Sequence, residues 1–68
     1  MRPYTLRQLE TFLAVAQETS VSRAAERLHV TQPAVSMQLR QLEQALGSPL
    51  LEPSGRGIAL TGAGTELR

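Results

Sequence analysis

The apolar positions in the middle of the chain form two helical stripes with a very short break between them. The first stripe has the spacing i, i+3, i+4 and i+7, which places its members on one face of a helix: Val21, Ala24, Ala25 and Leu28. A second stripe with helical spacing follows: Val35, Leu39, Leu42 and Leu46. The link between them, His29 to Thr31, is long enough only for a sharp corner. The pattern predicts a helix-turn-helix, with the small Ala24 and Ala25 at a close crossing and Val30 as the apolar anchor of the turn.

Proline and glycine mark the ends of the second helix of this pair. Pro33 disfavours helical geometry in the residue before it, so Thr31 or Gln32 caps the helix and Pro33 lies in its first turn. Gly47 is the expected left-handed C-cap. His29 holds a turn position where helix-turn-helix proteins favour glycine, and histidine is one of the few other residues that tolerate a positive φ.

An earlier helix is predicted over Leu6–Glu18. Thr5 and Gln8 have the spacing of a capping box at its start. Four apolar residues at helical spacing are expected to form its buried stripe, with Phe12 beside them: Leu6, Leu9, Leu13 and Ala16. Ser20 is the expected N-cap of the following helix, over Val21–Leu28.

The pattern changes character after Leu50. Two very short apolar segments, Leu50–Glu52 and Ile58–Leu60, flank a turn rich in glycine and proline and predict a small β-hairpin, or wing. Helical character resumes at Thr61, weakened by Gly62 and Gly64. The predicted fold is mainly α: a winged helix-turn-helix domain over residues 1–60, and over residues 61–68 the truncated start of a linker or dimerisation helix. An end in the middle of a helix indicates a piece of a longer protein.

Composition narrows the possible functions. A chain of 68 residues has room for one domain, and it contains no cysteine for a disulfide or a thiolate metal site. Neither a membrane span nor a signal peptide is expected, since no apolar segment approaches the about 18–20 residues of a span. All seven basic residues are arginine, which suits phosphate and guanine, although genomic base composition explains the bias equally well. The net charge of +1 is low for a nucleic-acid binder, so affinity depends on where the arginines lie and on more than one copy of the domain.

No catalytic constellation is visible in the sequence. The chain has no aspartate, a single histidine, and no glycine-rich loop between a strand and a helix to hold a phosphate. His29 has no second metal ligand near it in the sequence and is interpreted as a turn residue. We therefore expect a protein that is not an enzyme and that needs no metal or cofactor.

Several sequence elements together closely resemble the N-terminal domain of LysR-type transcriptional regulators. The matching positions cover essentially the whole chain: Leu9, Phe12 and Ala16, the segment Ser22–Leu28 (SRAAERL), the segment Thr31–Ser36 (TQPAVS), Gln41-Leu42-Glu43, Leu46-Gly47, Gly55-Arg56 and Leu60-Thr61. The resemblance implies a cytoplasmic bacterial regulator that is dimeric or tetrameric and binds a double-stranded DNA operator with an interrupted palindrome. It also implies a C-terminal domain, absent here, that binds a small-molecule effector, and a long helix near Thr61 that pairs two subunits.

The expected DNA contacts lie on the recognition helix, about residues 32–46, and on the wing: Gln32, Pro33, Ala34, Ser36, Met37, Arg40, Gln41 and Arg56. Gln32 can pair bidentately with adenine, while Ala34 and Met37 offer apolar surface to thymine methyl groups. Ser36 suits a phosphate oxygen. Arg56, flanked by two glycines, suits a narrow minor groove. An ordinary solvated helix face and a free loop arginine remain the alternatives.

The chain departs from the family pattern in two places, one on the recognition helix and one in the wing. The family usually carries Arg or Lys after Ser36, where this chain has Met37, and commonly shows Phe and Arg in the wing where it has Leu51 and Pro53. A guanine or phosphate contact is therefore not expected from Met37. For Arg27, pairing within its own helix and contact with DNA are equally compatible with the sequence.

A different class of function also fits the helical pattern. An all-α interaction module could use helix-turn-helix geometry for packing alone and bind protein with its polar face. The wing discriminates between the two, because an arginine at its tip serves DNA and has no obvious purpose in a simple helical bundle.

Overall fold

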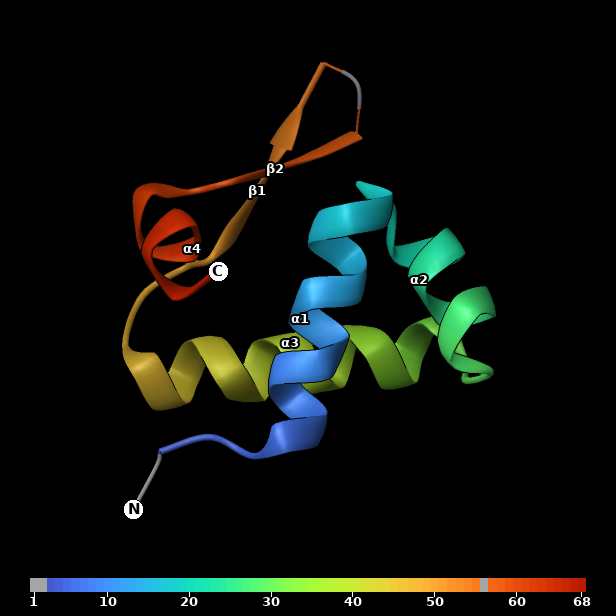
Figure 1. Ribbon diagram of the computed structural model, residues 1–68, viewed down its shortest axis with the longest axis horizontal. Coiled ribbons are helices and arrows are strands. Elements are labelled where there is room, and N and C mark those ends of the chain that lie inside the picture. Colours follow the sequence, from blue (N-terminus) through green and yellow to red (C-terminus); the bar gives the residue numbers. More distant parts are fainter. Residues whose placement is uncertain (1–2, 56) are drawn as a thin grey trace.

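The computed structural model describes residues 3–55 and 57–68. Four helices and a two-stranded antiparallel hairpin follow one another along the chain: α1 (Leu6–Glu18), α2 (Val21–Leu28), α3 (Gln32–Leu46), β1 (Leu51–Ser54), β2 (Gly57–Leu60) and α4 (Gly62–Leu67). The first three helices pack against one another, and α1 crosses over α3 (Figure 1). The hairpin leaves the C-terminal side of α3 and extends past the end of α1, with α4 folded back at its base (Figure 1). This arrangement confirms the predicted winged helix-turn-helix fold.

Residues with hydroxyl side chains cap the N-termini of the first three helices, as the sequence indicates. Thr5 and Gln8 form the predicted capping box, in which each side chain accepts a hydrogen bond from the other residue's backbone N–H. Ser20 caps α2. At α3 the cap is Thr31, whose hydroxyl accepts from the N–H of Ala34. The choice between Thr31 and Gln32 is thereby settled, and Gln32 is the first residue of α3.

Three helices end on a residue in the left-handed conformation. Gly47 at φ 71° and His29 at φ 59° confirm the two positions expected from the sequence. Thr19 at φ 53° ends α1 in the same way. A β-branched residue rarely adopts this conformation, so the corner between α1 and α2 is a strained position that the sequence pattern does not reveal.

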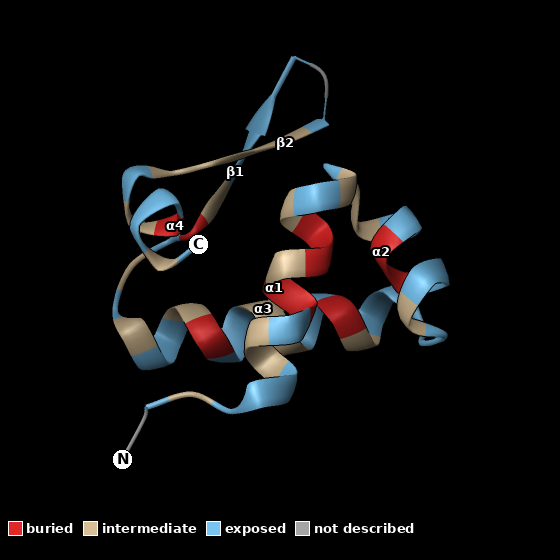
Figure 2. Cartoon of the chain, in the orientation of Figure 1, coloured by how far each residue is buried: buried red, intermediate tan, exposed pale blue. Residues whose placement is uncertain are grey.

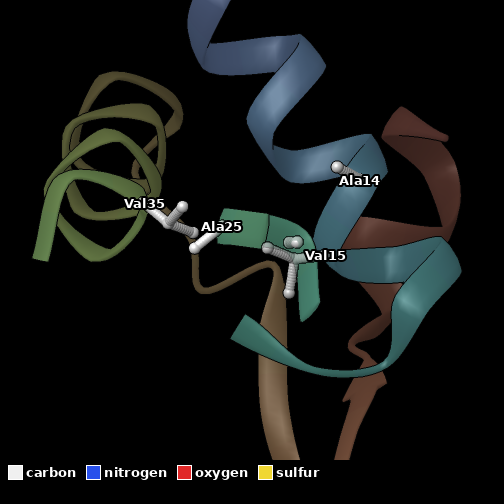
Figure 3. Close-up of a cluster of buried hydrophobic side chains, with 5 residues drawn as sticks. Ala14, Val15, Ala25 and Val35 are labelled. Carbon is white, nitrogen blue, oxygen red and sulfur yellow. The ribbon is translucent and has the colours of Figure 1, made fainter. Parts of the chain in front are cut away.

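The core consists of two clusters of buried side chains. The first joins the three helices: Ala14, Val15, Ala24, Ala25 and Val35. Ala25 lies between Val15 and Val35 (Figure 3), so its small side chain lets the helices approach closely, as expected. The second cluster joins the helices to the hairpin: Phe12, Leu42 and Leu50, with Ala63 and Leu67 of α4 packed against it.

The buried face predicted for α1 is right for Phe12, wrong for Leu6 and only partly right for the other three residues. The fully buried positions are Thr11, Phe12, Ala14 and Val15. Leu6 is 65% exposed, and the rest of the predicted stripe is only half-buried: Leu9, Leu13 and Ala16. The reason is that α1 packs against both α2 and α3, which leaves Leu9 and Leu13 at the edge of the buried face, packed against the second cluster. Thr11 enters the core because its hydroxyl donates to the carbonyl oxygen of Arg7 at 2.9 Å.

The role predicted for Val30 is also wrong. Its side chain is 40% exposed and anchors nothing in the core. The turn is held by backbone hydrogen bonds. The N–H of Val30 donates to the carbonyl oxygen of Ala25 at 3.0 Å, and the N–H of His29 donates to the carbonyl oxygen of Glu26 at 3.2 Å. A left-handed residue at the corner makes these hydrogen bonds possible without a buried side chain.

The hairpin is present and is longer than the two predicted segments. Its register pairs Leu51 with Leu60 at the base and Ser54 with Gly57 at the tip. Pro53 fits because the sheet has only two strands, and a proline is tolerated on a strand with a free edge.

Candidate nucleic-acid interface

One face of α3 is buried and the opposite face is open to solvent. Val35 and Leu42 are buried, whereas the residues half a turn away are exposed: Pro33, Met37, Arg40 and Gln44. Figure 2 shows this alternation as red and pale blue bands along the helix. Met37 lies at the centre of the exposed face with 48% of its surface accessible, so it presents an apolar side chain to solvent there.

The two flanks of this face are set by neighbouring helices. On one flank Gln32 is exposed, and its Nε2 donates to Oγ of Ser22 in α2 at 3.3 Å. On the other flank Oε1 of Gln41 accepts from Nε2 of Gln8 in α1 at 3.2 Å. The exposed face of α3 is therefore bordered by two interhelical amide contacts rather than by loose side chains.

Ala34 differs from the other predicted contact residues on α3. It is half-buried and lines a hollow of about 420 Å³ between α1, the turn and α3, together with Leu6 and Val30. Ser36 and Arg40 are exposed, and the Arg40 guanidinium forms no ion pair with any of the described residues. Ala34 thus belongs to the flank beside α1, while Ser36 and Arg40 stay accessible.

The tip of the hairpin lies beside the corner between α1 and α2. A Cβ built on Gly57 would come within 2.7 Å of the carbonyl oxygen of Thr19, so β2 begins directly against that corner. The corner leads into the first turn of α2, and Ser22 in that turn contacts Gln32. The start of α3, the start of α2 and the hairpin tip therefore form one continuous edge of the molecule. Arg56 itself lies outside the described residues.

Glu43 connects the recognition helix to the base of the hairpin. Its Oε2 accepts hydrogen bonds from the backbone N–H groups of Leu50 at 2.7 Å and Leu51 at 3.4 Å. The carboxylate thereby occupies two N–H groups at the start of β1 and fixes where the wing leaves α3. The sequence reasoning missed this role. The only available signal was a glutamate four residues before the helix-ending Gly47, close to the next strand.

Arg27 holds α2 against α1. Its Nη1 donates to Oε1 of Gln17 at 2.6 Å and lies 3.4 Å from Oε2 of Glu18. The alternative of pairing within its own helix is therefore wrong, because the carboxylate that it contacts belongs to α1. Within the described part of the chain, Arg7, Arg23 and Arg40 form no ion pair, and all three are exposed.

Other kinds of site are not seen in residues 3–55 and 57–68. These residues include no group of three or more histidine, cysteine or acidic side chains arranged to hold a metal ion. None of the helices in the same residues has the length and apolar character needed to cross a membrane.

Comparison with known proteins gives one family. The model of the "bacterial regulatory helix-turn-helix protein, lysR family" matches residues 6–65. The RuBisCO operon transcriptional regulator of Allochromatium vinosum is 56% identical over 63 residues, which are 93% of this chain and 21% of that protein. The chain therefore spans about a fifth of the length of this relative.

The similar structures include complexes with DNA. The complex of the CbnR DNA-binding domain with DNA has a TM-score of 0.85 and 50% sequence identity, covering 91% of this chain and 71% of that one. The complex of the BenM DNA-binding domain with catB site 1 DNA has a TM-score of 0.86 and 40% identity, covering 91% and 70%. With a family model that spans nearly the whole chain and a fold that superposes on these domains, the chain belongs to the lysR family of bacterial regulatory helix-turn-helix proteins, as a winged helix-turn-helix DNA-binding domain.

Proposed function

We propose that this domain reads one half of a double-stranded operator, with α3 in the major groove. The observation that carries the proposal is the exposed face of α3 around Met37, which has its polar flanks fixed by neighbouring helices and no protein element covering it. Recognition helices of this type contact base edges with their N-terminal residues. Gln32 and Pro33 form the first turn of α3, so they are the first to meet the bases.

Each exposed residue of this face suits a particular part of the duplex. Gln32 offers a donor and an acceptor to adenine, and Met37 offers apolar surface to a thymine methyl group. Ser36 and Arg40 suit phosphate oxygens, which position the helix without reading sequence. Pro33 adds rigid surface at the helix start. Ala34 and Gln41 lie on the flank toward α1 and contribute to the edge of the contact.

The wing supplies a second contact, through Arg56 in the adjacent minor groove. Support comes from the hairpin tip, which lies at the end of the edge that also holds the starts of α2 and α3. An arginine presented there reaches a narrow minor groove, where the negative potential is strongest.

Membership of the family supports a proposal for the domain division and for the setting of the whole protein. Residues 1–60 form the DNA-binding domain, and residues 61–68 begin the helix that pairs two subunits. The pair reads an interrupted palindrome as a dimer or tetramer in the bacterial cytoplasm, and a C-terminal domain binds a small-molecule effector. The domain itself carries no catalytic role.

Selection from a random duplex pool, followed by titration of the selected site, tests this function. Gln32→Ala is expected to cost about 1–3 kcal/mol on the selected site and to relax preference at one base pair. Gln44→Ala removes the same amide from the exposed face near the end of α3 and should have a smaller effect, since the N-terminal part of the helix reads the bases. Equal weakening of selected and random DNA by Gln32→Ala would make Gln32 a backbone contact. Selection of no preferred sequence would favour a protein-binding module instead.

A further inference from the structure

Two side chains from different helices meet at the start of the recognition helix. Nε2 of Gln32 donates to Oγ of Ser22 at 3.3 Å, and both residues are exposed. Ser22 is not needed to cap α2, because Ser20 fills that role by accepting from the N–H of Arg23. The contact therefore serves neither the core nor a helix end, and it acts on a side chain that the proposed function assigns to base reading.

We propose that Ser22 is a positioning residue that holds the Gln32 amide in the orientation that reads adenine; this inference rests on the proposed function. A glutamine side chain has several rotatable bonds, and an exposed one loses much rotational freedom when it binds a base. A hydrogen bond that already restrains the amide in the free protein reduces that loss. The effect of Ser22 is thus preorganisation of another residue rather than a contact of its own with DNA.

The hydrogen-bonding capacity of the amide fits this arrangement. A glutamine amide has two N–H donors and one carbonyl oxygen. When one N–H is bonded to Ser22, the amide keeps one N–H and Oε1. Adenine presents an acceptor at N7 and a donor at N6 in the major groove, which this remaining pair satisfies, whereas guanine presents two acceptors. Restraint by Ser22 therefore raises both affinity for adenine and discrimination against guanine.

A double-mutant cycle tests the inference. Ser22→Ala, Gln32→Ala and the double variant are titrated with the selected duplex and with the same duplex carrying G·C at the pair that Gln32 reads. Ser22→Ala should weaken binding to the selected duplex about three- to tenfold, the range that one net hydrogen bond gives. It should weaken the G·C duplex less, and it should cause no further loss once Gln32 is alanine. Ser22→Thr keeps a hydroxyl and should restore most of the affinity.

A measurement without DNA separates positioning from a merely structural role. In the free protein, ¹⁵N relaxation of the Gln32 side-chain amide should show greater mobility in Ser22→Ala, with an unchanged thermal unfolding midpoint. If Ser22→Ala weakens binding equally with Gln32 and with Ala at position 32, and lowers the salt dependence, Ser22 contacts a phosphate itself and the inference is wrong. Unchanged affinity in Ser22→Ala also overturns it. If Gln32→Ala alone leaves affinity and base preference intact, the assignment of Gln32 in the proposed function fails first, and the inference fails with it.

Discussion

Gly57 at the start of β2 and Thr19 at the end of α1 are in such close contact that no side chain fits between them. A Cβ atom on Gly57 would lie 2.7 Å from the carbonyl oxygen of Thr19, closer than real Cβ atoms approach an oxygen. Gly57 also has a φ of 126°, which other residues rarely adopt. The position of the wing relative to the helix-turn-helix thus depends on the absence of one methyl group.

Gly57→Ala should therefore displace the wing and also strain the backbone at residue 57. We expect a loss of about 1–3 kcal/mol in the free energy of unfolding, from the backbone conformation and the displaced carbonyl. Affinity for the selected duplex should fall too, because the wing tip no longer lies beside the start of α2. Urea unfolding and DNA titration measure the two effects separately.

Gly55→Ala is the matched control for this prediction. A Cβ on Gly55 would meet no atom within 4 Å, and its φ lies outside the left-handed region. This variant should unfold and bind like the parent. If Gly57→Ala also unfolds and binds DNA like the parent, the contact with Thr19 does not set the position of the wing.

Local signals predicted the fold well, and tertiary contacts account for what they missed. Helix ends depend on residues close in sequence, such as Thr5 with Gln8, and could be predicted within a residue. The buried face of α1 depends on how two other helices approach it, so the apolar stripe from Leu6 was misleading. Gly64 was interpreted as a weakness of the last helix. In the structure a Cβ there would overlap the carbonyl oxygen of Leu50, so this glycine permits α4 to pack against the chain just before β1.

In the candidate site, too, the exposure of the residues was predictable from the sequence, whereas the contacts between elements were not. Exposure of Met37 and Arg40 follows from helical periodicity and was predictable from the buried stripe alone. The link from Ser22 to Gln32 joins two helices, and no sequence spacing indicates it. The link from Glu43 to Leu50 joins α3 to the residue before β1, and its only signal is a glutamate near the end of the helix. These hydrogen bonds determine how the contact residues are held. The exposure of a residue alone does not reveal such restraints.

Arg56→Ala is expected to reduce affinity and to lower the slope of log affinity against log salt concentration by about one unit, as removal of one phosphate-neutralising charge does. Most of the loss should appear on sites with A·T-rich flanks, where the minor groove is narrow. Titration at four or five salt concentrations gives the slope. Arg7→Ala is the matched control, since it removes the same charge from the first turn of α1, on the side of α3 where Gln8 contacts Gln41. It should change the slope less. An unchanged slope in Arg56→Ala would mean that this arginine points into solvent.

Met37→Arg should raise general affinity for DNA and shift base preference toward guanine near its contact. The physical reason is that Met37 lies at the centre of the exposed face with an apolar side chain, which can contact thymine methyl groups but forms no charge-assisted hydrogen bond. Selection with the variant gives the new preference. Gln44→Arg adds the same charge on the same face two turns later and should raise affinity without changing the preferred bases. If Met37→Arg changes neither affinity nor preference, α3 does not enter the groove as far as this residue.

Tight DNA binding by this domain should require two joined copies, because a single copy carries little net charge. A net charge of +1 gives little general attraction to DNA, so one copy should bind DNA at physiological salt with a Kd in the non-specific range, about 10⁻⁴–10⁻⁶ M. Two joined copies can read both halves of a palindrome about one helical turn apart, and effective concentration then raises affinity without any new contact. The 68-residue chain contributes little surface for joining, since α4 spans only Gly62–Leu67 and directs Ala63 and Leu67 into its own core.

We therefore expect the 68-residue chain to sediment as a monomer in dilute solution and to bind a single half-site weakly. A chain extended after Arg68 by a few turns of the corresponding helix of a lysR-family relative should dimerise, because a longer α4 adds surface beyond the positions already packed against Leu50 and Phe12. Its affinity for the full palindrome should then rise by orders of magnitude, while its affinity for an isolated half-site stays nearly the same. Analytical ultracentrifugation, combined with titrations of full and half sites, separates dimer formation from any change in the contact itself. A tight dimer of the 68-residue chain would contradict this prediction and would place the contact between subunits on another surface, with the exposed Leu6 at the start of α1 as its centre.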